Sequence, residues 1–373
     1  MRYFSLVPAL LLLVGLISAC KPEKIDGQLI PDPGLTWQPH PDFIFDRKVQ
    51  LTSYADSNII ILSGIGTTAI APDPDSRSKT DTTFEHFGGQ AKNNGRTDYR
   101  PLLHPNFFGF LFNDLVYIVS TREPVTSTPN GTADRVILSQ LDPDFASFYT
   151  LPVWGGETMA ANKQDQFIVP YTVYDRSSAT PVVSQTEIRL MLVSLNVKKE
   201  PFGGVKVART QKITLPGSGI IGSIQSIGPN FIVSTGSGTY RIKPDGSVAK
   251  TYSGGFRRQF TFSKTTYGLS GSTFWASTDQ GESWSTFASN VPPDYSRASC
   301  KQVGNQLIAY LNSQLFQLNI TPTMLTAIEL DNTGLEDNQI TSIAQFRNTA
   351  YISTMSGVFT KPVRTFLMPK LVK

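Results

Sequence analysis

The chain has 373 residues, a formal net charge of only +4, 17% charged residues and 11% aromatic residues. Its basic residues are scattered, which argues against the clustered positive surface of a nucleic-acid-binding protein. The 29 glycines and 25 prolines, together with many β-branched and aromatic residues, favour an all-β protein with many turns. We therefore expect one large β-rich domain with no nucleic-acid partner.

The first residues have the pattern of an export signal. Met1-Arg2 is a short positive region, and residues 6–17 form an apolar stretch that is too short for a typical membrane-spanning helix. This pattern predicts that residues 1–19 are a cleaved signal peptide. Its removal takes away Arg2 and leaves a net charge of +3, since residues 1–19 hold no other charged residue.

The signal ends in the small residues Ser18 and Ala19, followed directly by Cys20. This ending resembles the lipobox of bacterial lipoproteins, and the resemblance implies that Cys20 is lipidated and anchors the chain stably through several acyl groups. An ordinary secretory signal with a coincidental cysteine is the alternative. The charged run that follows, Lys21-Pro22-Glu23-Lys24, loosely resembles the surface-export signals of Bacteroidota lipoproteins. The implied location is the bacterial cell envelope, with the chain lipid-anchored at the outer membrane.

Residues 20–45 are rich in proline and turn-forming residues, which predicts an extended tether between the anchor and the folded domain. If Cys20 carries lipid, Cys300 has no partner for a disulfide within the chain. We expect Cys300 to be a buried, inert thiol.

The C-terminal half contains a structural repeat. Residues 222–242, 298–318 and 340–360 each show a strand, a Gly/Asn turn, a second strand, a tight turn and a third strand with a central aromatic residue. A fourth unit, residues 259–287, also has a central aromatic residue. Successive central aromatic residues are roughly 34 to 43 positions apart, which is the repeat length of propeller blades. Residues 49–62, 107–151 and 158–215 form less regular units. The chain is thus predicted to be a single β-propeller over residues 46–368, with about seven four-stranded blades, although six or eight are possible. Residues 42–45 are expected to supply the strand that closes the ring.

One turn within the repeat has a recognisable motif. Its fixed positions follow the pattern S-x-D-x-G-x-[ST]-W and are Ser277, Asp279, Gly281, Ser283 and Trp284. Asp279 is expected to accept hydrogen bonds from nearby backbone N–H groups and Gly281 to adopt positive φ, while Trp284 packs beside the hairpin. The pattern resembles the Asp box of the sialidase-type, or BNR-type, β-propellers. That resemblance implies a propeller in which the motif stabilises a turn away from the substrate face.

The sequence does not carry the remaining signs of a sialidase. Those enzymes use an arginine cluster, a Tyr–Glu nucleophile pair and an acid/base Asp, and they carry an F/Y-R-I-P-type motif that is missing here. The arginines that could still converge are Arg96, Arg100, Arg122, Arg189, Arg241, Arg297 and Arg347. The pairs Asp73/Asp75 and Asp142/Asp144 are expected to cap turns, and His40, His86 and His104 lack metal-ligand spacing. We predict no catalytic residue, no metal site and no cofactor, and whether the chain is an enzyme stays open, with the balance against it.

Three segments are longer than blades require: residues 73–101, 121–134 and 175–186. Each is either a functional loop or surface decoration. Trp37, Trp154 and Tyr174 are candidates for an exposed binding rim, with simple packing as the alternative. The function predicted from these features is a non-catalytic, membrane-anchored propeller that binds a protein partner or a glycan at the cell envelope. The alternatives are a diverged carbohydrate-active enzyme, namely a sialidase-like glycoside hydrolase, and an assembly factor of an envelope complex.

Overall fold

The computed structural model describes residues 34–43, 49–53, 59–63, 67–72, 82–87, 102–112, 114–120, 133–148, 159–177, 180–184, 186–197, 204–216, 221–289, 298–321, 324–335 and 337–370. All of them belong to the unit Gly34–Lys373. The predicted lipidation site Cys20 and the candidate rim residue Trp154 lie outside the described residues.

The strands pair as antiparallel sheets of consecutive segments, which we number as blades. Blade 1 comprises β2 (Val49–Ser53), β3 (Ile59–Ser63), β4 (Thr67–Pro72) and β5 (Thr82–Phe87). Blade 2 comprises β6 (Leu102–His104), β7 (Phe107–Phe112), β8 (Leu115–Ser120) and β9 (Ala133–Ile137). Blade 3 comprises β11 (Ala160–Ala161), β12 (Gln166–Asp175), β14 (Glu187–Val197) and β15 (Val205–Pro216), with β10 (Phe145–Phe148) and β13 (Val182–Val183) added along β12.

The C-terminal half continues the same order. Blade 4 comprises β16 (Ile221–Ile227), β17 (Asn230–Thr235), β18 (Gly238–Ile242) and β19 (Val248–Tyr252). Blade 5 comprises β20 (Arg258–Phe262), β21 (Thr265–Ser270), β22 (Thr273–Ser277) and β23 (Ser285–Ser289). Blade 6 comprises β24 (Ser299–Val303), β25 (Gln306–Leu311), β26 (Gln314–Ile320) and β27 (Met324–Glu329). Blade 7 comprises β28 (Ile340–Phe346), β29 (Thr349–Thr354), β30 (Gly357–Pro362) and β1 (Gln38–Pro39).

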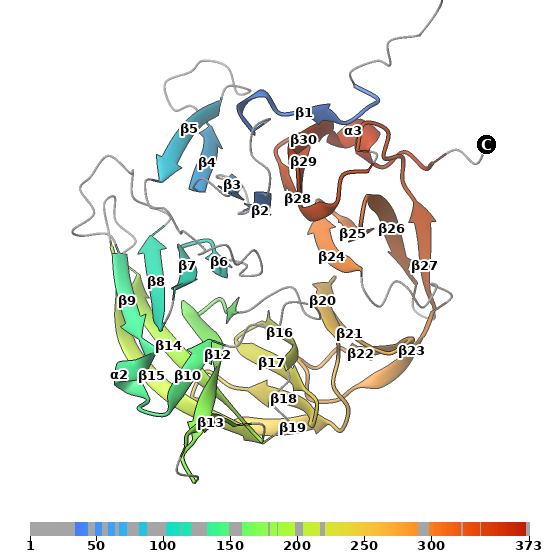
Figure 1. Ribbon diagram of the computed structural model, residues 1–373. Coiled ribbons are helices and arrows are strands. Elements are labelled where there is room, and N and C mark those ends of the chain that lie inside the picture. Colours follow the sequence, from blue (N-terminus) through green and yellow to red (C-terminus); the bar gives the residue numbers. More distant parts are fainter. Residues whose placement is uncertain are drawn as a thin grey trace, which may run out of the picture. The chain divides into compact units, whose positions relative to one another are not determined.

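The described strands form six sheets, and one of these is eight-stranded because blades 5 and 6 pair through β23 and β27, so the blades number seven. Figure 1 shows them around a ring, and the innermost strands β6, β11, β16, β20, β24, β28 and β2 contact one another in that order. This arrangement is a seven-bladed β-propeller and confirms the fold predicted from the repeat.

Burial explains why these segments are strands. The second strands β17 and β29 are buried at almost every position, and their apolar and small side chains face a neighbouring blade on either side. The outermost strands are less buried, since β19 has three exposed residues and β27 has two.

Four aliphatic and aromatic clusters join neighbouring blades. They connect blades 2 and 3, blades 3 and 4, blades 5 and 6, and blades 6 and 7. Examples of residues that share a cluster, in that order, are Val116 with Val169, Leu190 with Phe231, Leu269 with Leu307, and Ile308 with Ile352. In the described part of the chain, no cluster of this kind joins blade 4 to blade 5.

Two segments differ from the predicted strand assignment. The strand β10, predicted as the last strand of the second unit, pairs instead with β12 of blade 3. The predicted insertion at residues 73–101 contains β5, which is the fourth strand of blade 1. The structure also has two helical turns that the sequence does not predict, α2 (Leu138–Leu141) and α3 (Val363–Phe366). Among the described residues, no helix has the length and hydropathy needed to cross a bilayer.

The ring is closed by residues that precede the predicted closing segment. Gln38–Pro39 pairs with Thr360 and Phe359 of β30, whereas Pro41–Phe43 forms a 3₁₀ turn. Part of the segment predicted as a tether therefore belongs to blade 7.

Trp37 belongs to the core and not to an exposed rim, which corrects its prediction as a binding residue. The residue is 2% exposed, its ring meets Phe366 edge-on at 5.6 Å, and its backbone N–H donates to Thr333 O at 2.9 Å. Thr365 Oγ1 also donates to Gly34 O at 2.5 Å. These contacts fix the start of the described chain to its last blade.

Candidate functional site: a projecting hairpin on blade 3

The hairpin formed by the end of β12 and by β13 projects beyond the ring (Figure 1). Tyr174 pairs with Val183, and Asp175 pairs with Val182. The side chains of Tyr174, Val182 and Val183 are 38%, 55% and 40% exposed. Tyr174 and Val183 are cross-strand partners and share one face of the hairpin, whereas Val182, opposite Asp175, points to the other face. We call these three side chains the hairpin patch. Three large apolar side chains on one short hairpin are a feature of surfaces that contact other molecules.

The hairpin projects because β12 is longer than the core beside it. The strand has ten residues, and its burial ends at Val173, after which Tyr174 and Asp175 are exposed. Ser184 N donates to Val173 O at 2.7 Å, and Ser177 N donates to Asp175 Oδ1 at 2.9 Å. The hydrogen bonds from Ser177 hold the pKa of Asp175 below its ordinary value. Local polar contacts thus shape the turn, while the apolar side chains stay in solvent.

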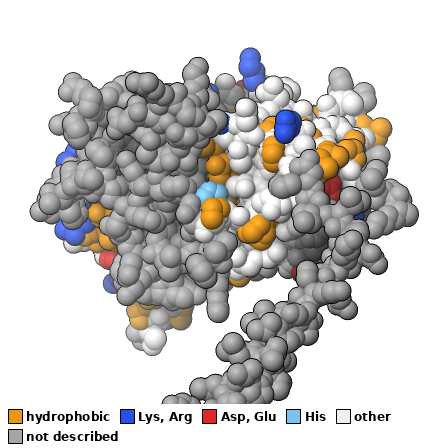
Figure 2. Space-filling view, turned by 90° about the horizontal axis from the view of Figure 1, so that it is seen from above, with side chains coloured by type: hydrophobic (Ala, Val, Ile, Leu, Met, Phe, Trp, Pro, Cys, Tyr) orange, Lys and Arg blue, Asp and Glu red, His pale blue; other side chains and the backbone are white. Residues whose placement is uncertain are grey.

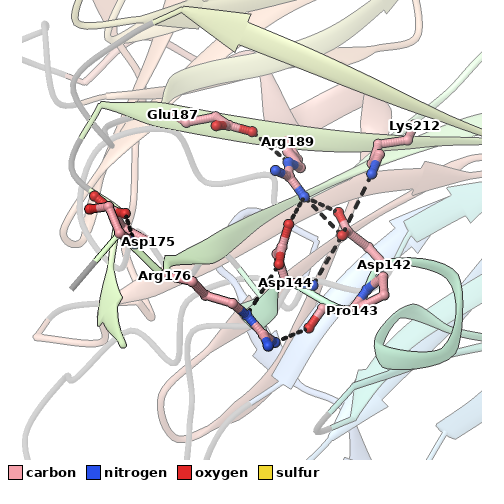
Figure 3. Close-up of polar contacts among 9 residues, drawn as sticks. Asp142, Pro143, Asp144, Asp175, Arg176, Glu187, Arg189 and Lys212 are labelled. Atoms are coloured by element: carbon pink, nitrogen blue, oxygen red, sulfur yellow. Dashed lines mark hydrogen bonds and ion pairs between the residues drawn. The ribbon is translucent and has the colours of Figure 1, made fainter. Parts of the chain in front are cut away.

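A group of charged residues lies at the base of the hairpin (Figure 3). Arg176, directly after β12, forms an ion pair with Asp144 at 3.2 Å and donates to Pro143 O at 2.6 Å. Tyr174 N also donates to Asp144 O at 2.8 Å. The loop between α2 and β10 therefore braces the hairpin.

Asp142 forms the buried part of this base. Arg189 of β14 donates to both of its carboxylate oxygens at 2.8 Å, and the hydroxyl of Tyr171 donates to Oδ2 at 2.8 Å. Asp144 N donates to Oδ1 at 3.2 Å, and Lys212 lies 3.7 Å from the same oxygen. Arg189 and Tyr171 face Asp142 together because they are direct partners in the β12–β14 register.

The electrostatic environment at the base of the hairpin favours the charged forms of Asp142 and Arg189. Burial alone raises the pKa of Asp142, but hydrogen bonds from Arg189 and Tyr171 outweigh it and leave the pKa below its ordinary value. Burial and the Asp142 carboxylate raise the pKa of Tyr171. Burial opposes the charge on Arg189, but its bonds to Asp142, Glu187 and Asp144 raise its pKa overall. An acid catalyst needs a raised carboxyl pKa and access to substrate. The pKa of Asp142 is lowered and its side chain is fully buried, so it meets neither condition.

The residues of the predicted Asp box form a hydrogen-bonded turn between β22 and β23. Asp279 accepts from Ser277 Oγ at 2.8 Å, from Ser283 N at 3.0 Å and from Ser283 Oγ at 2.5 Å. Burial opposes the charge, but these bonds lower the pKa of Asp279 to about 2. Gly281 has φ +82°, and the Trp284 Nε1–H donates to Thr251 Oγ1 at 3.3 Å. The geometry is that of a stabilised turn, and the sialidase or BNR relationship that the motif suggests stays a prediction.

The other candidate residues are dispersed. Arg189, Arg241 and Arg347 belong to blades 3, 4 and 7. Cys300 packs against the cluster between blades 5 and 6, and burial raises the pKa of its thiol to about 12, so it is protonated at neutral pH. Among the described residues, no three His, Cys, Asp or Glu side chains gather as a metal site. On the face drawn in Figure 2, the described surface shows several hydrophobic side chains and few charged ones.

The geometry defines a β-propeller with a projecting apolar hairpin. No protein-family model matches the chain, and no curated protein matches it. Solved structures share its general fold. The extracellular domain of a putative hybrid two-component system from B. thetaiotaomicron has 12% identity and a TM-score of 0.46, over 88% of this chain and 39% of that chain. The WD40 β-propeller domain of Doa1 has 9% identity and a TM-score of 0.47, over 85% and 93%.

Apo AztD from Citrobacter koseri is similar to the same degree, with 12% identity and a TM-score of 0.47 over 85% of this chain and 84% of that chain. The present chain spans 39% of the length of the two-component-system domain. At such identities the likeness concerns the fold alone, and the propeller assignment rests on the sheets described above.

Proposed function

We propose that the protein is a non-catalytic, lipid-anchored β-propeller of the bacterial cell envelope that binds a protein partner through the hairpin patch. The observation that carries this proposal is the projection of Tyr174, Val182 and Val183 from a base held by the buried Arg189–Asp142 ion pair and the exposed Arg176–Asp144 ion pair. A rigid base lowers the entropy cost of binding, because the hairpin does not have to become ordered when the partner docks.

The chemistry of the patch favours a protein over a glycan. Two of its three side chains are aliphatic, and valines offer carbohydrate neither a flat aromatic face nor a hydrogen-bonding group. Protein interfaces bury such apolar side chains at their centre and surround them with polar groups. A standard interface buries about 800 Å² per partner. We therefore expect neighbouring blade 3 residues, such as the exposed Leu141, to contribute as well.

The alternative of a diverged glycoside hydrolase is less well supported. It needs two carboxyl groups that face a substrate, one of them with a raised pKa. Asp142 and Asp144 both bind Arg189 instead. A hydrolysis assay of the purified chain on envelope glycans tests this alternative directly, and turnover would contradict the proposal.

The test is crosslinked affinity capture from native envelopes with the full chain tagged at its C-terminus. The site variant is Tyr174→Ser/Val182→Ser/Val183→Ser. The matched control is Val248→Ser/Met324→Ser/Ile328→Ser, which removes three side chains of similar exposure, 40–41%, from the outermost strands of blades 4 and 6. We expect a stoichiometric protein partner with the wild type and the control, and its loss with the hairpin variant. Equal capture by both variants would place the interface elsewhere.

The anchor is tested separately with Cys20→Ala. We expect this variant to leave the membrane fraction while retaining the circular dichroism spectrum of a folded propeller. Retention in the outer-membrane fraction would contradict lipid anchoring at Cys20 without bearing on the hairpin.

A further inference from the structure

The interface between blades 4 and 5 differs from the other described blade contacts in its chemistry. Hydroxyl and amide side chains occupy its inner part, where the other interfaces hold aliphatic clusters. Its buried hydroxyl-bearing residues, each at most 3% exposed, are Ser223, Ser234, Thr239, Thr266 and Ser277. We call this interface the polar seam.

Hydrogen bonds cross the seam between the first and second strands of the two blades. Gln225 of β16 donates from Nε2 to Thr261 Oγ1 of β20 at 2.8 Å, and Gln259 of β20 donates to Ser234 Oγ of β17 at 2.7 Å. Ser234 is in turn 2.8 Å from Thr239 Oγ1. Such bonds add only modestly to stability, because water satisfies the same groups when the interface opens.

Unpartnered polar atoms gather in the same two blades. The buried side-chain atoms without a protein partner there include Gln225 Oε1, Gln259 Oε1, Arg241 Nε and Trp275 Nε1. Two of these atoms are acceptors and two are donors, which is the combination that bridging water satisfies. A buried polar group left without any partner keeps its full desolvation penalty, so water is strongly favoured there.

The seam also contains an aromatic cluster. Phe256 is stacked on Tyr252 at 5.0 Å and lies 4.6 Å from the Trp284 ring. The Phe256 ring occupies space left by Gly268, where an added Cβ would approach it to 2.6 Å. Phe256 also reaches the innermost strand of blade 4, because Ser223 Oγ of β16 donates to Phe256 O at 2.9 Å. The blades are thus held together by polar groups and by one aromatic cluster around Phe256.

We propose that the polar seam holds ordered water and is the joint at which the propeller ring opens, with the aromatic cluster around Phe256 acting as the hinge. Opening there exchanges protein hydrogen bonds for water hydrogen bonds and exposes few aliphatic side chains. Opening at the aliphatic interface between blades 6 and 7 exposes a large apolar cluster instead.

Hydrogen exchange of the full chain, read by mass spectrometry, tests the joint. Peptides from β16, β17, β20 and β21 are compared with peptides from β24, β25, β28 and β29, which are the innermost and second strands of blades 6 and 7. We expect the seam strands to exchange about tenfold faster, because local openings that expose less apolar surface cost less free energy. Equal or slower exchange in the seam strands would overturn the proposal.

A variant pair links the difference to the polar groups. Ser234→Ala/Gln259→Leu makes the seam apolar and is expected to slow exchange in the seam strands severalfold. The control Gln302→Leu makes the same amide-to-aliphatic change on the innermost strand of blade 6, where Gln302 is exposed and its amide donates to Gly304 O at 2.9 Å. We expect the control to leave seam exchange unchanged. Unchanged exchange in the double variant would overturn the proposal, and the wild-type comparison stands if that variant does not fold.

A crystal structure of the full chain with ordered solvent tests the water. We expect water within hydrogen-bond distance of Gln225 Oε1 or Gln259 Oε1. Direct protein partners for both oxygens would contradict a hydrated seam. None of these measurements depends on the binding partner, so failure here is distinguishable from failure of the proposed function.

Discussion

Asp142 is the residue on which the base of the hairpin depends. Removing one member of a buried ion pair typically costs about 3–5 kcal/mol. Because Arg189 keeps Asp144 and Glu187 as partners, we expect Asp142→Asn to lower the free energy of unfolding by about 3 kcal/mol, at the lower end of that range. Urea unfolding at pH 7 measures it. The control Asp144→Asn, at a carboxylate that is 36% exposed, should cost less than about 1 kcal/mol.

The same pair predicts a pH dependence. The folded pKa of Asp142 lies below its ordinary value of 3.8. The stability that its charge contributes is therefore present above that value and is lost as the pH falls through the lower, folded pKa. The difference between wild type and Asp142→Asn should shrink in acid. A difference that stays constant from neutral to strongly acidic pH would show that Asp142 does not carry the charge.

At the scale of elements, the turn between β22 and β23 depends on Gly281 for two reasons. Its φ is +82°, and a Cβ there would lie 2.2 Å from Ile232 Cδ1. Gly271 has φ +61° and open space around it, so Gly271→Ala isolates the cost of the backbone conformation, about 1–2 kcal/mol. We expect Gly281→Ala to cost about 1–3 kcal/mol more, from overpacking. Thermal unfolding of both variants measures the difference, and equal losses would refute the steric part.

The turns also explain which elements are predictable from the sequence. Blades 4, 6 and 7 turn between their first two strands at a residue of positive φ, namely Gly228, Gly304 and Arg347. Glycine and asparagine in these turns, with buried strands on both sides, make the repeat visible in the sequence. The prediction places β10 in the wrong blade because only α2 and a short loop separate it from β9, and its pairing with β12 depends on contacts distant in sequence.

The candidate site is less predictable than the fold. The type and position of Tyr174 indicate an exposed aromatic residue, but the ion pairs beneath it join Asp142 to Arg189, which are 47 residues apart. Only the register of β12 and β14 brings Tyr171 and Arg189 opposite each other. Because β12 is buried on both faces, its residues show no alternation from which that register could be inferred. The prediction for Trp37 is wrong because this residue stands in a proline-rich segment without periodicity, and its burial depends on Phe366.

For the whole molecule, ring closure gives a prediction with a matched pair of truncations. A chain that starts at Gly34 keeps β1, Trp37 and Phe43, whereas a chain that starts at Ile44 loses all three. Trp37 and Phe43 are 2% and 3% exposed, and burying such side chains contributes about 1.5–3 kcal/mol each. We expect the longer chain to melt close to the full-length protein and the shorter one to be destabilised by about 3–6 kcal/mol. Similar melting of the two truncated chains would contradict closure by residues 34–43.

The hydrogen bond between Thr365 and Gly34 joins residues 331 positions apart, and it has a consequence for biosynthesis. The strand that is translated first in the described chain finds its partner, β30, only after nearly the whole protein has been made. Closing so long a loop is entropically costly and slow, because non-local pairings form late. A nascent chain therefore carries an incomplete ring until its last blade emerges, and a chain that ends before Gly357 leaves its first strand without the edge on which it folds.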